Sequence, residues 1–292
     1  MDASSLTGAH YAVSDRDLAV KEQAIQFGSP PRLLGILSRP PLIPPGTPAL
    51  LIPNTGFEHR VGPHRLHVHL CRALADAGFP TLRLDLSGLG DSPASSTDAV
   101  SDLQAAMDRL SQQGTAQHFG LIGLCSGAND AHLAALADPR VIGAAFIDHY
   151  CYPTARFRRN FWRERLLDWR RARNFLSGLL PRREETEKDR FRADQIEYFA
   201  QPSADDYAAQ LQRLVDRDLA LYFLYTGEVL SSYNYREQLT DAFPVLRKHQ
   251  RLTLHFMPHA DHTFSQIHMR KELVEGLRDW AIRFLQPDLT RG

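Results

Sequence analysis

The chain has 292 residues, of which 43% are hydrophobic and 23% are charged, a composition that supports a packed core and excludes wholesale disorder. Its 34 basic and 34 acidic residues give zero net charge, so no global charge attracts nucleic acid or an anionic membrane. Three cysteines are too few for a disulfide scaffold, and we expect neither a signal peptide nor a membrane-spanning segment. We therefore expect a cytoplasmic globular protein with free thiols.

Strand-like and helix-like segments alternate along most of the chain. A polar N-terminal segment is expected over residues 1–20, followed by two short strands and a proline-rich loop that cannot be helical. Apolar runs then predict further strands at 49–52, 81–86, 118–124 and 141–147, and helical spacing predicts helices at 65–77, 99–110 and 128–137. This alternation indicates the α/β class, with a mostly parallel sheet and helices on both of its faces.

The alternation is interrupted after the strand at 141–147 and resumes near residue 217 with strands at 220–226 and 252–257 and helices at 235–246 and 264–285. The intervening stretch is aromatic and rich in arginine. Within 151–195, 13 basic residues face 7 acidic ones, a local net charge of +6. We therefore predict a core formed by 21–149 and 217–292, with a helical cap at 150–216.

A Gly-x-Cys-x-Gly sequence at residues 123–127 lies between a predicted strand and a predicted helix. Such a turn needs glycines because the nucleophile takes a strained backbone conformation where strand and helix approach closely. Cys125 occupies the nucleophile position, where a helix N-terminus and a nearby imidazole activate a thiol. The backbone N–H of Ser126 is a candidate donor to an oxyanion.

His262 follows the strand at 252–257 and precedes the last helix, so it is the candidate general base. Glu228, just after the strand at 220–226, is the first candidate for the carboxylate that orients it. Asp148, at the end of the strand at 141–147, is the alternative. The order nucleophile, acid, histidine is that of α/β-hydrolases.

The chain resembles the α/β-hydrolase superfamily over residues 20–290, which implies an α/β-hydrolase fold with a cap. Residues 51–57 resemble the oxyanion loop and imply the N–H of Phe57 as a second donor, and 85–92 resemble the Asp-x-x-Gly-x-Gly-x-Ser turn. The cysteine elbow resembles those of dienelactone hydrolases and polyhydroxyalkanoate synthases. The run 58–65 resembles hydrolase-like proteins associated with exopolysaccharide and exosortase systems.

A cysteine nucleophile favours thioesters, activated esters or lactones as substrates. From a simple ester, the tetrahedral intermediate returns the enzyme thiolate more readily than it expels an alkoxide, whereas a thioester offers two comparable sulfurs. Thioesterase-like or esterase-like hydrolysis is the expected activity. The alternatives are an acyltransferase or cyclase that uses the same acyl-cysteine, and a catalytically silent ligand-binding protein.

The basic cap suggests an anionic partner, because arginine binds phosphate and carboxylate groups in a forked geometry. Coenzyme A, a phosphopantetheine arm or an acyl carrier protein would fit, although a solvated amphipathic face explains the charge equally well. Candidate substrate-binding residues are Arg60, Arg65, Arg156 and Trp162. No cofactor or metal is expected; three histidines at 64–69 have metal-like spacing, but a solvated helix start explains them better. The oligomeric state stays open.

Overall fold

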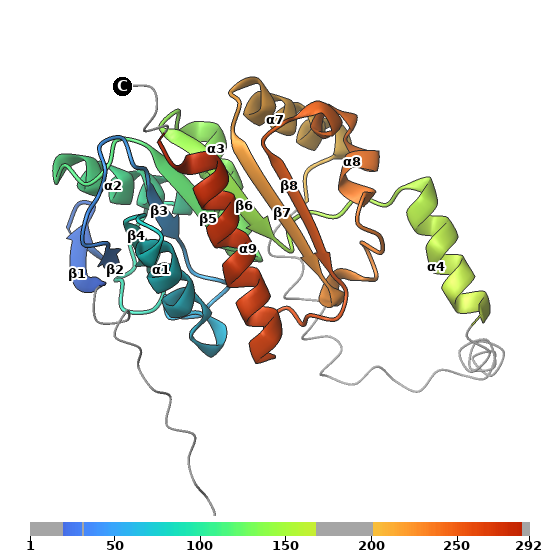
Figure 1. The fold of residues 1–292 in the computed structure, drawn as a ribbon, viewed down its shortest axis with the longest axis horizontal. Helices are drawn as coiled ribbons and strands as arrows, with labels where there is room; N and C mark the ends of the chain where they lie inside the picture. The colour runs from blue at the N-terminus through green and yellow to red at the C-terminus, as the bar shows by residue number, and fades with distance from the viewer. Residues whose placement is uncertain (1–19, 31, 168–200, 288–292) are drawn as a thin grey trace, which may run out of the picture.

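The computed structural model describes residues 20–30, 32–167 and 201–287. Within them the chain forms one eight-stranded sheet of order β1-β2-β4-β3-β5-β6-β7-β8, shown in Figure 1. Strand β2 runs antiparallel to both of its neighbours, and the remaining pairs are parallel. The strands are β1 Lys21–Phe27, β2 Leu33–Arg39, β3 Ala49–Ile52, β4 Thr81–Leu84, β5 Phe119–Leu124, β6 Val141–Ile147, β7 Ala220–Thr226 and β8 Leu252–Met257.

Helices cover both faces of the sheet, which confirms the predicted α/β architecture. One core cluster joins the sheet to α2 (Ala99–Gln112) and α3 (Ser126–Ala137). The other joins it to α1 (Leu66–Asp76) and α9 (Ile267–Leu285). Every residue of β5 and β7 is buried, as expected for central parallel strands that are covered on both sides.

The stretch between β6 and β7 contains two described helices with different surroundings. Helix α7 (Ala204–Asp216) buries Tyr207, Leu211 and Leu214 in the core cluster around α3. Although the cap was predicted to extend to residue 216, this part packs as a core helix. Helix α4 (Ala155–Leu167) projects away from the sheet in Figure 1. The cap residues 168–200, and residues 1–19 of the predicted N-terminal segment, lie outside the described residues.

The predicted helix at 235–246 is wrong as a continuous element. The structure has α8 (Gln238–Ala242) followed by the 3-10 helix η4 (Pro244–Lys248). Proline has no N–H to donate and disfavours a helical conformation in the residue before it. Phe243 accordingly has φ −127° and ψ 86°, which ends α8.

No helix among the described residues combines the length and apolar content needed to cross a bilayer. The parallel strands β5, β6, β7 and β8 all end at the same edge of the sheet. The loops that follow β5, β6, β7 and β8 there carry the residues described next. Ligand sites in open α/β sheets form at this carboxyl edge.

Candidate active site

Cys125 lies in a sharp turn between β5 and α3. Its φ of 57° and ψ of −121° are a conformation that side-chain-bearing residues rarely adopt. A Cβ on Gly123 would lie 2.1 Å from the carbonyl oxygen of Gly127, and one on Gly127 would lie 2.4 Å from that of Asn54. Both glycines are therefore required by close backbone approach, and the turn presents a half-buried thiol at the carboxyl edge.

His262 comes from the loop between β8 and α9, and Asp148 directly follows β6. The Nδ1 atom of His262 lies 2.7 Å from Oδ2 of Asp148, whose side chain is 1% exposed, against 26% for His262. Cys125 is the other side chain whose interaction with His262 raises the pKa of the imidazole. The three side chains thus form a chain from carboxylate to imidazole to thiol.

The pKa of His262 reflects these partners. Burial alone would lower it, but the hydrogen bonds and charges of Asp148 and Cys125 raise the pKa to about 10. The imidazolium form of His262 is therefore favoured at neutral pH.

The carboxylate beside His262 is Asp148, the alternative, and not Glu228. Glu228 is exposed in the 3-10 turn η3 (Gly227–Val229), and its backbone N–H lies 3.3 Å from Oγ1 of Thr226. The turn after β7 thus directs the Glu228 side chain to the surface. Asp148 reaches the histidine because it leaves the neighbouring strand β6 with a φ of 51° and accepts hydrogen bonds from Thr226.

The loop at 54–58 lies against the elbow, as the predicted oxyanion loop requires. The backbone N–H of Gly56 donates to Oγ of Ser126 over 2.6 Å. Ser126 begins α3, so its own N–H is at the positive end of the helix. Phe57 is 80% exposed, and its predicted backbone contact to an oxyanion stays a proposal.

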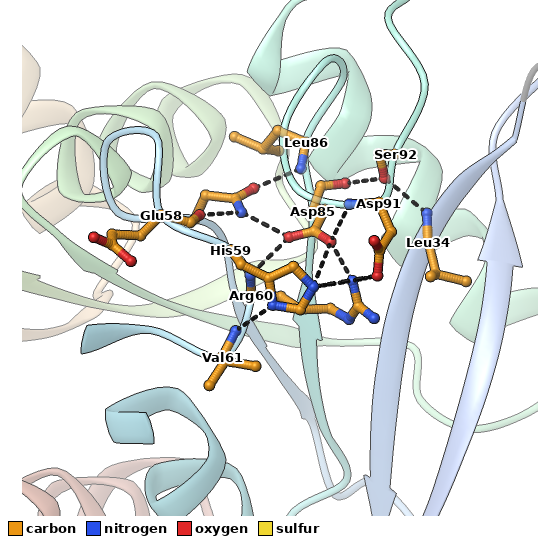
Figure 2. Close-up of polar contacts among 10 residues, drawn as sticks. Leu34, Glu58, His59, Arg60, Val61, Asp85, Leu86, Asp91 and Ser92 are labelled. Atoms are coloured by element: carbon orange, nitrogen blue, oxygen red, sulfur yellow. Dashed lines mark hydrogen bonds and ion pairs between the residues drawn. The ribbon is translucent and has the colours of Figure 1, made fainter. Parts of the chain in front are cut away.

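Figure 2 shows how buried Asp85 holds this loop against the turn at 85–92. Its carboxylate accepts from Nδ2 of Asn54 at 2.8 Å, from the backbone N–H of Arg60 at 2.7 Å and from that of Asp91 at 3.0 Å. Oγ of Ser92 donates to the carbonyl oxygen of Asp85 over 2.7 Å. The Asp-x-x-Gly-x-Gly-x-Ser sequence therefore builds a support for the 54–58 loop.

Arg60 belongs to this support, and its predicted role in binding substrate stays a prediction. Its nearly buried guanidinium pairs with Asp85 and lies 2.8 Å from Oδ2 of Asp91. His59, Asp85 and Asp91 place potential ligand atoms within 4.8 Å of one another, as a metal site would. The guanidinium also lies 2.8 Å from Nε2 of His59, so the arginine already supplies the positive charge at this cluster.

The other predicted substrate-binding residues lie apart from the triad contacts. Arg65 is exposed at the start of α1 in a left-handed conformation. Arg156 lies over the ring of Tyr235, 4.2 Å from its centroid, and Trp162 is 58% exposed on α4. None of these three side chains has a recorded contact with Cys125, His262 or Asp148 among the described residues. Their roles toward substrate stay proposals.

Two supporting residues were not predicted as such from sequence. Thr226 binds both carboxylate oxygens of Asp148, with its N–H 2.7 Å from Oδ1 and its Oγ1 2.7 Å from Oδ2. Asn54 ties the oxyanion loop to Asp85 and accepts from the N–H of Leu86 over 2.7 Å. Thr226 could have been found from its position, because it ends a buried strand next to the strand that Asp148 follows. Asp261 takes a turn role and accepts hydrogen bonds from Thr263 and Ser265.

Comparison with known proteins agrees with this geometry. The family model described as the alpha/beta hydrolase family matches residues 45–275. The chain belongs to the α/β-hydrolase family. It is accordingly a hydrolase enzyme. No curated protein sequence matches it significantly.

Several solved structures are similar to this α/β hydrolase in fold. A dienelactone hydrolase from Anabaena variabilis is 16% identical with a TM-score of 0.56, covering 92% of this chain and 100% of that one. An esterase from Pyrococcus furiosus is 12% identical with a TM-score of 0.57, covering 94% and 95%. A cold-adapted esterase from an Arctic intertidal metagenomic library is 15% identical with a TM-score of 0.56, covering 92% and 96%.

Proposed function

We propose that this α/β hydrolase is a cysteine-dependent acyl hydrolase that forms an acyl-enzyme on Cys125. The observation that carries the proposal is the contact chain at the elbow. Cys125 is held in a strained turn and interacts with His262, whose Nδ1 is 2.7 Å from Oδ2 of Asp148. A nucleophile, a base and an oriented carboxylate in this order are what acyl transfer requires.

The reaction begins from the thiolate–imidazolium pair. The Cys125 sulfur attacks the acyl carbon and forms a C–S bond, while the carbonyl π electrons move onto the oxygen. The N–H groups of Ser126 and Phe57 stabilise that oxyanion, a contribution worth about 10²–10³ in rate per donor. The intermediate collapses as the bond to the leaving group breaks, and the leaving group takes the proton from His262.

Hydrolysis completes the cycle. His262, now neutral, removes a proton from water, and the resulting hydroxide attacks the acyl carbon. The C–S bond breaks, the acid is released and the thiolate–imidazolium pair is restored. An amine or alcohol that replaces water in this step would make the same site an acyltransferase or cyclase.

The sulfur nucleophile favours thioesters, activated esters and lactones over plain esters, since the leaving group must compete with a thiolate. The dienelactone hydrolase that this chain resembles in fold is consistent with the lactone option. The exposed arginines of α4, Arg158, Arg159 and Arg163, support an acyl group carried on coenzyme A or on an acyl carrier protein. We include Arg65, Arg156 and Trp162 as proposed contacts to such a carrier.

Intact-protein mass spectrometry after mixing with a panel of acyl thioesters, activated esters and lactones tests the proposal. The wild type and a Cys151→Ala variant should gain one acyl group, whereas Cys125→Ala should gain none. The lifetime of the adduct in water, compared with its lifetime in added amines or alcohols, separates hydrolase from transferase. If no adduct and no turnover arise across the panel, the catalytic proposal is wrong and a silent ligand-binding role is favoured.

A further inference from the structure

The Asp148 carboxylate is buried, yet three of its hydrogen bonds come from only two residues. Oδ1 accepts the backbone N–H of Thr226 at 2.7 Å. Oδ2 is shared by Oγ1 of Thr226 and Nδ1 of His262, each 2.7 Å away. The same oxygen that faces the histidine is therefore held from its other side by a threonine hydroxyl.

The direction of the Thr226 hydroxyl is fixed by a further contact. The backbone N–H of Glu228 donates a hydrogen bond to Oγ1 of Thr226 over 3.3 Å. With that lone pair engaged, the hydroxyl proton is free to donate to Asp148, which as an ionised carboxylate only accepts. This hydrogen bond fixes the orientation of a carboxylate whose side chain is 1% exposed.

The same turn holds the loop that carries the histidine. The N–H of Gly227 donates to the carbonyl oxygen of Ala260 over 2.9 Å. A Cβ on Gly227 would lie 2.4 Å from the carbonyl oxygen of Pro258, so the two segments pack backbone to backbone. Residues 226–227 therefore bind the acid on one side and the segment before His262 on the other.

We propose that Thr226 is a positioning residue whose hydroxyl holds the Asp148 carboxylate aimed at Nδ1 of His262. The inference rests on the proposed acyl-enzyme function, since it assigns Thr226 a role in the same site. Thr226 touches no reacting atom in this scheme. Thr226 lies at the end of β7 and acts through Asp148. Strand β7 itself supplies no catalytic side chain in this scheme.

The test compares Thr226→Val, which removes the hydroxyl at nearly constant volume, with Thr226→Ser, which retains it. Thr81→Val is the matched control, because it removes a buried threonine hydroxyl that donates to the carbonyl oxygen of Phe79. We expect kcat and the single-turnover acylation rate to fall about tenfold in Thr226→Val with KM little changed. Thr226→Ser and Thr81→Val should acylate at close to the wild-type rate.

Proton NMR supplies a readout that does not depend on turnover. The Nδ1 proton of His262 should give a downfield resonance in wild type, Thr226→Ser and Thr81→Val. In Thr226→Val it should broaden or disappear as the imidazole–carboxylate contact loosens. Should Thr226→Val fail to fold, Thr226→Ala is read in the same two assays.

Three results would overturn the inference. These are a wild-type acylation rate in the folded Val or Ala variant, an unchanged Nδ1 resonance in that variant, or a Ser variant that behaves like Val. Failure of the proposed function gives a different pattern: the wild type itself forms no adduct. The NMR comparison still decides the role of Thr226 in that case.

Discussion

At the scale of single residues, the site depends on where one proton rests. His262 donates a hydrogen bond through Nδ1 to the Asp148 carboxylate, and Cys125 is its partner on the other side. The other two cysteines have no such partner in the proposed chemistry. Burial raises the pKa of the Cys71 thiol to about 12 and raises the pKa of Cys151 even further.

Selective alkylation follows from this difference. At pH 7, iodoacetamide should modify Cys125 well before Cys71 and Cys151, because only Cys125 is paired with an imidazolium. His262→Ala should slow the modification of Cys125 by about tenfold or more. Peptide mass spectrometry over time measures each thiol separately. Equal rates for the three cysteines would contradict the activated-thiol proposal.

The stability of the protein should also depend on pH through His262. Its folded-state pKa of about 10 lies above the unfolded value near ~6.5. His262 therefore binds its proton more tightly in the folded protein, and its full contribution to the free energy of unfolding is present below about pH 6.5. It declines as the pH rises toward 10. Urea unfolding of wild type and His262→Gln should show a difference that shrinks between these values, and a constant difference would count against the ion pair.

At the scale of elements, the loop at 54–60 links the elbow to the turn at 85–92. The 54–60 loop reaches the elbow through the hydrogen bond from Gly56 to Ser126 and is held from behind by Asp85. The Asp85–Arg60 pair is nearly inaccessible to solvent. Removing one member of such a pair leaves an uncompensated buried charge.

Asp85→Ala should therefore destabilise the protein by about 3–5 kcal/mol and lower the acylation rate, because the oxyanion loop loses its anchor. Asp91→Ala is the matched comparison. It removes an exposed carboxylate from the same arginine and should have a much smaller effect. Chemical unfolding measures the first effect and single-turnover acylation the second. Similar losses in both variants would show that Asp85 has no special structural role.

The sequence predicted the positions of those elements whose location depends on the burial of apolar residues alone. Strands β6 and β7 lie where their continuous apolar runs predicted them, because strands covered on both faces leave little choice. The acid and Arg60 depend on contacts between segments far apart in the chain. Arg60 meets Asp85, 25 residues away, and Asp148 meets His262, 114 residues away. Neither pairing leaves a local pattern in the sequence.

At the scale of the whole molecule, charge is distributed unevenly around a neutral chain. The protein has zero net charge, yet α4 exposes Arg158, Arg159 and Arg163 on a helix that projects beyond the sheet. A localised basic surface of this kind attracts anionic partners over a distance set by ionic strength.

The proposed carrier interaction predicts a salt effect. The KM for an acyl group on coenzyme A or a carrier protein should rise with salt concentration. It should also rise in the double variant that combines Arg158→Glu and Arg159→Glu. The KM for a small uncharged thioester should change little in both cases. Lys271→Glu, an exposed charge reversal on α9, serves as the control. A KM for the carrier-bound substrate that is insensitive to salt would contradict the role assigned to α4.

The position of Asp148 on β6 has a consequence for engineering. Since the proposed acid comes from the neighbouring strand, the segment 228–232 after β7 carries no proposed catalytic side chain, and its contact with Thr226 is made by the backbone N–H of Glu228. Glu228 and Leu230 in it are exposed. This segment is therefore the place to introduce sequence libraries, in which altered selectivity can be screened while the acid and its threonine partner are left intact.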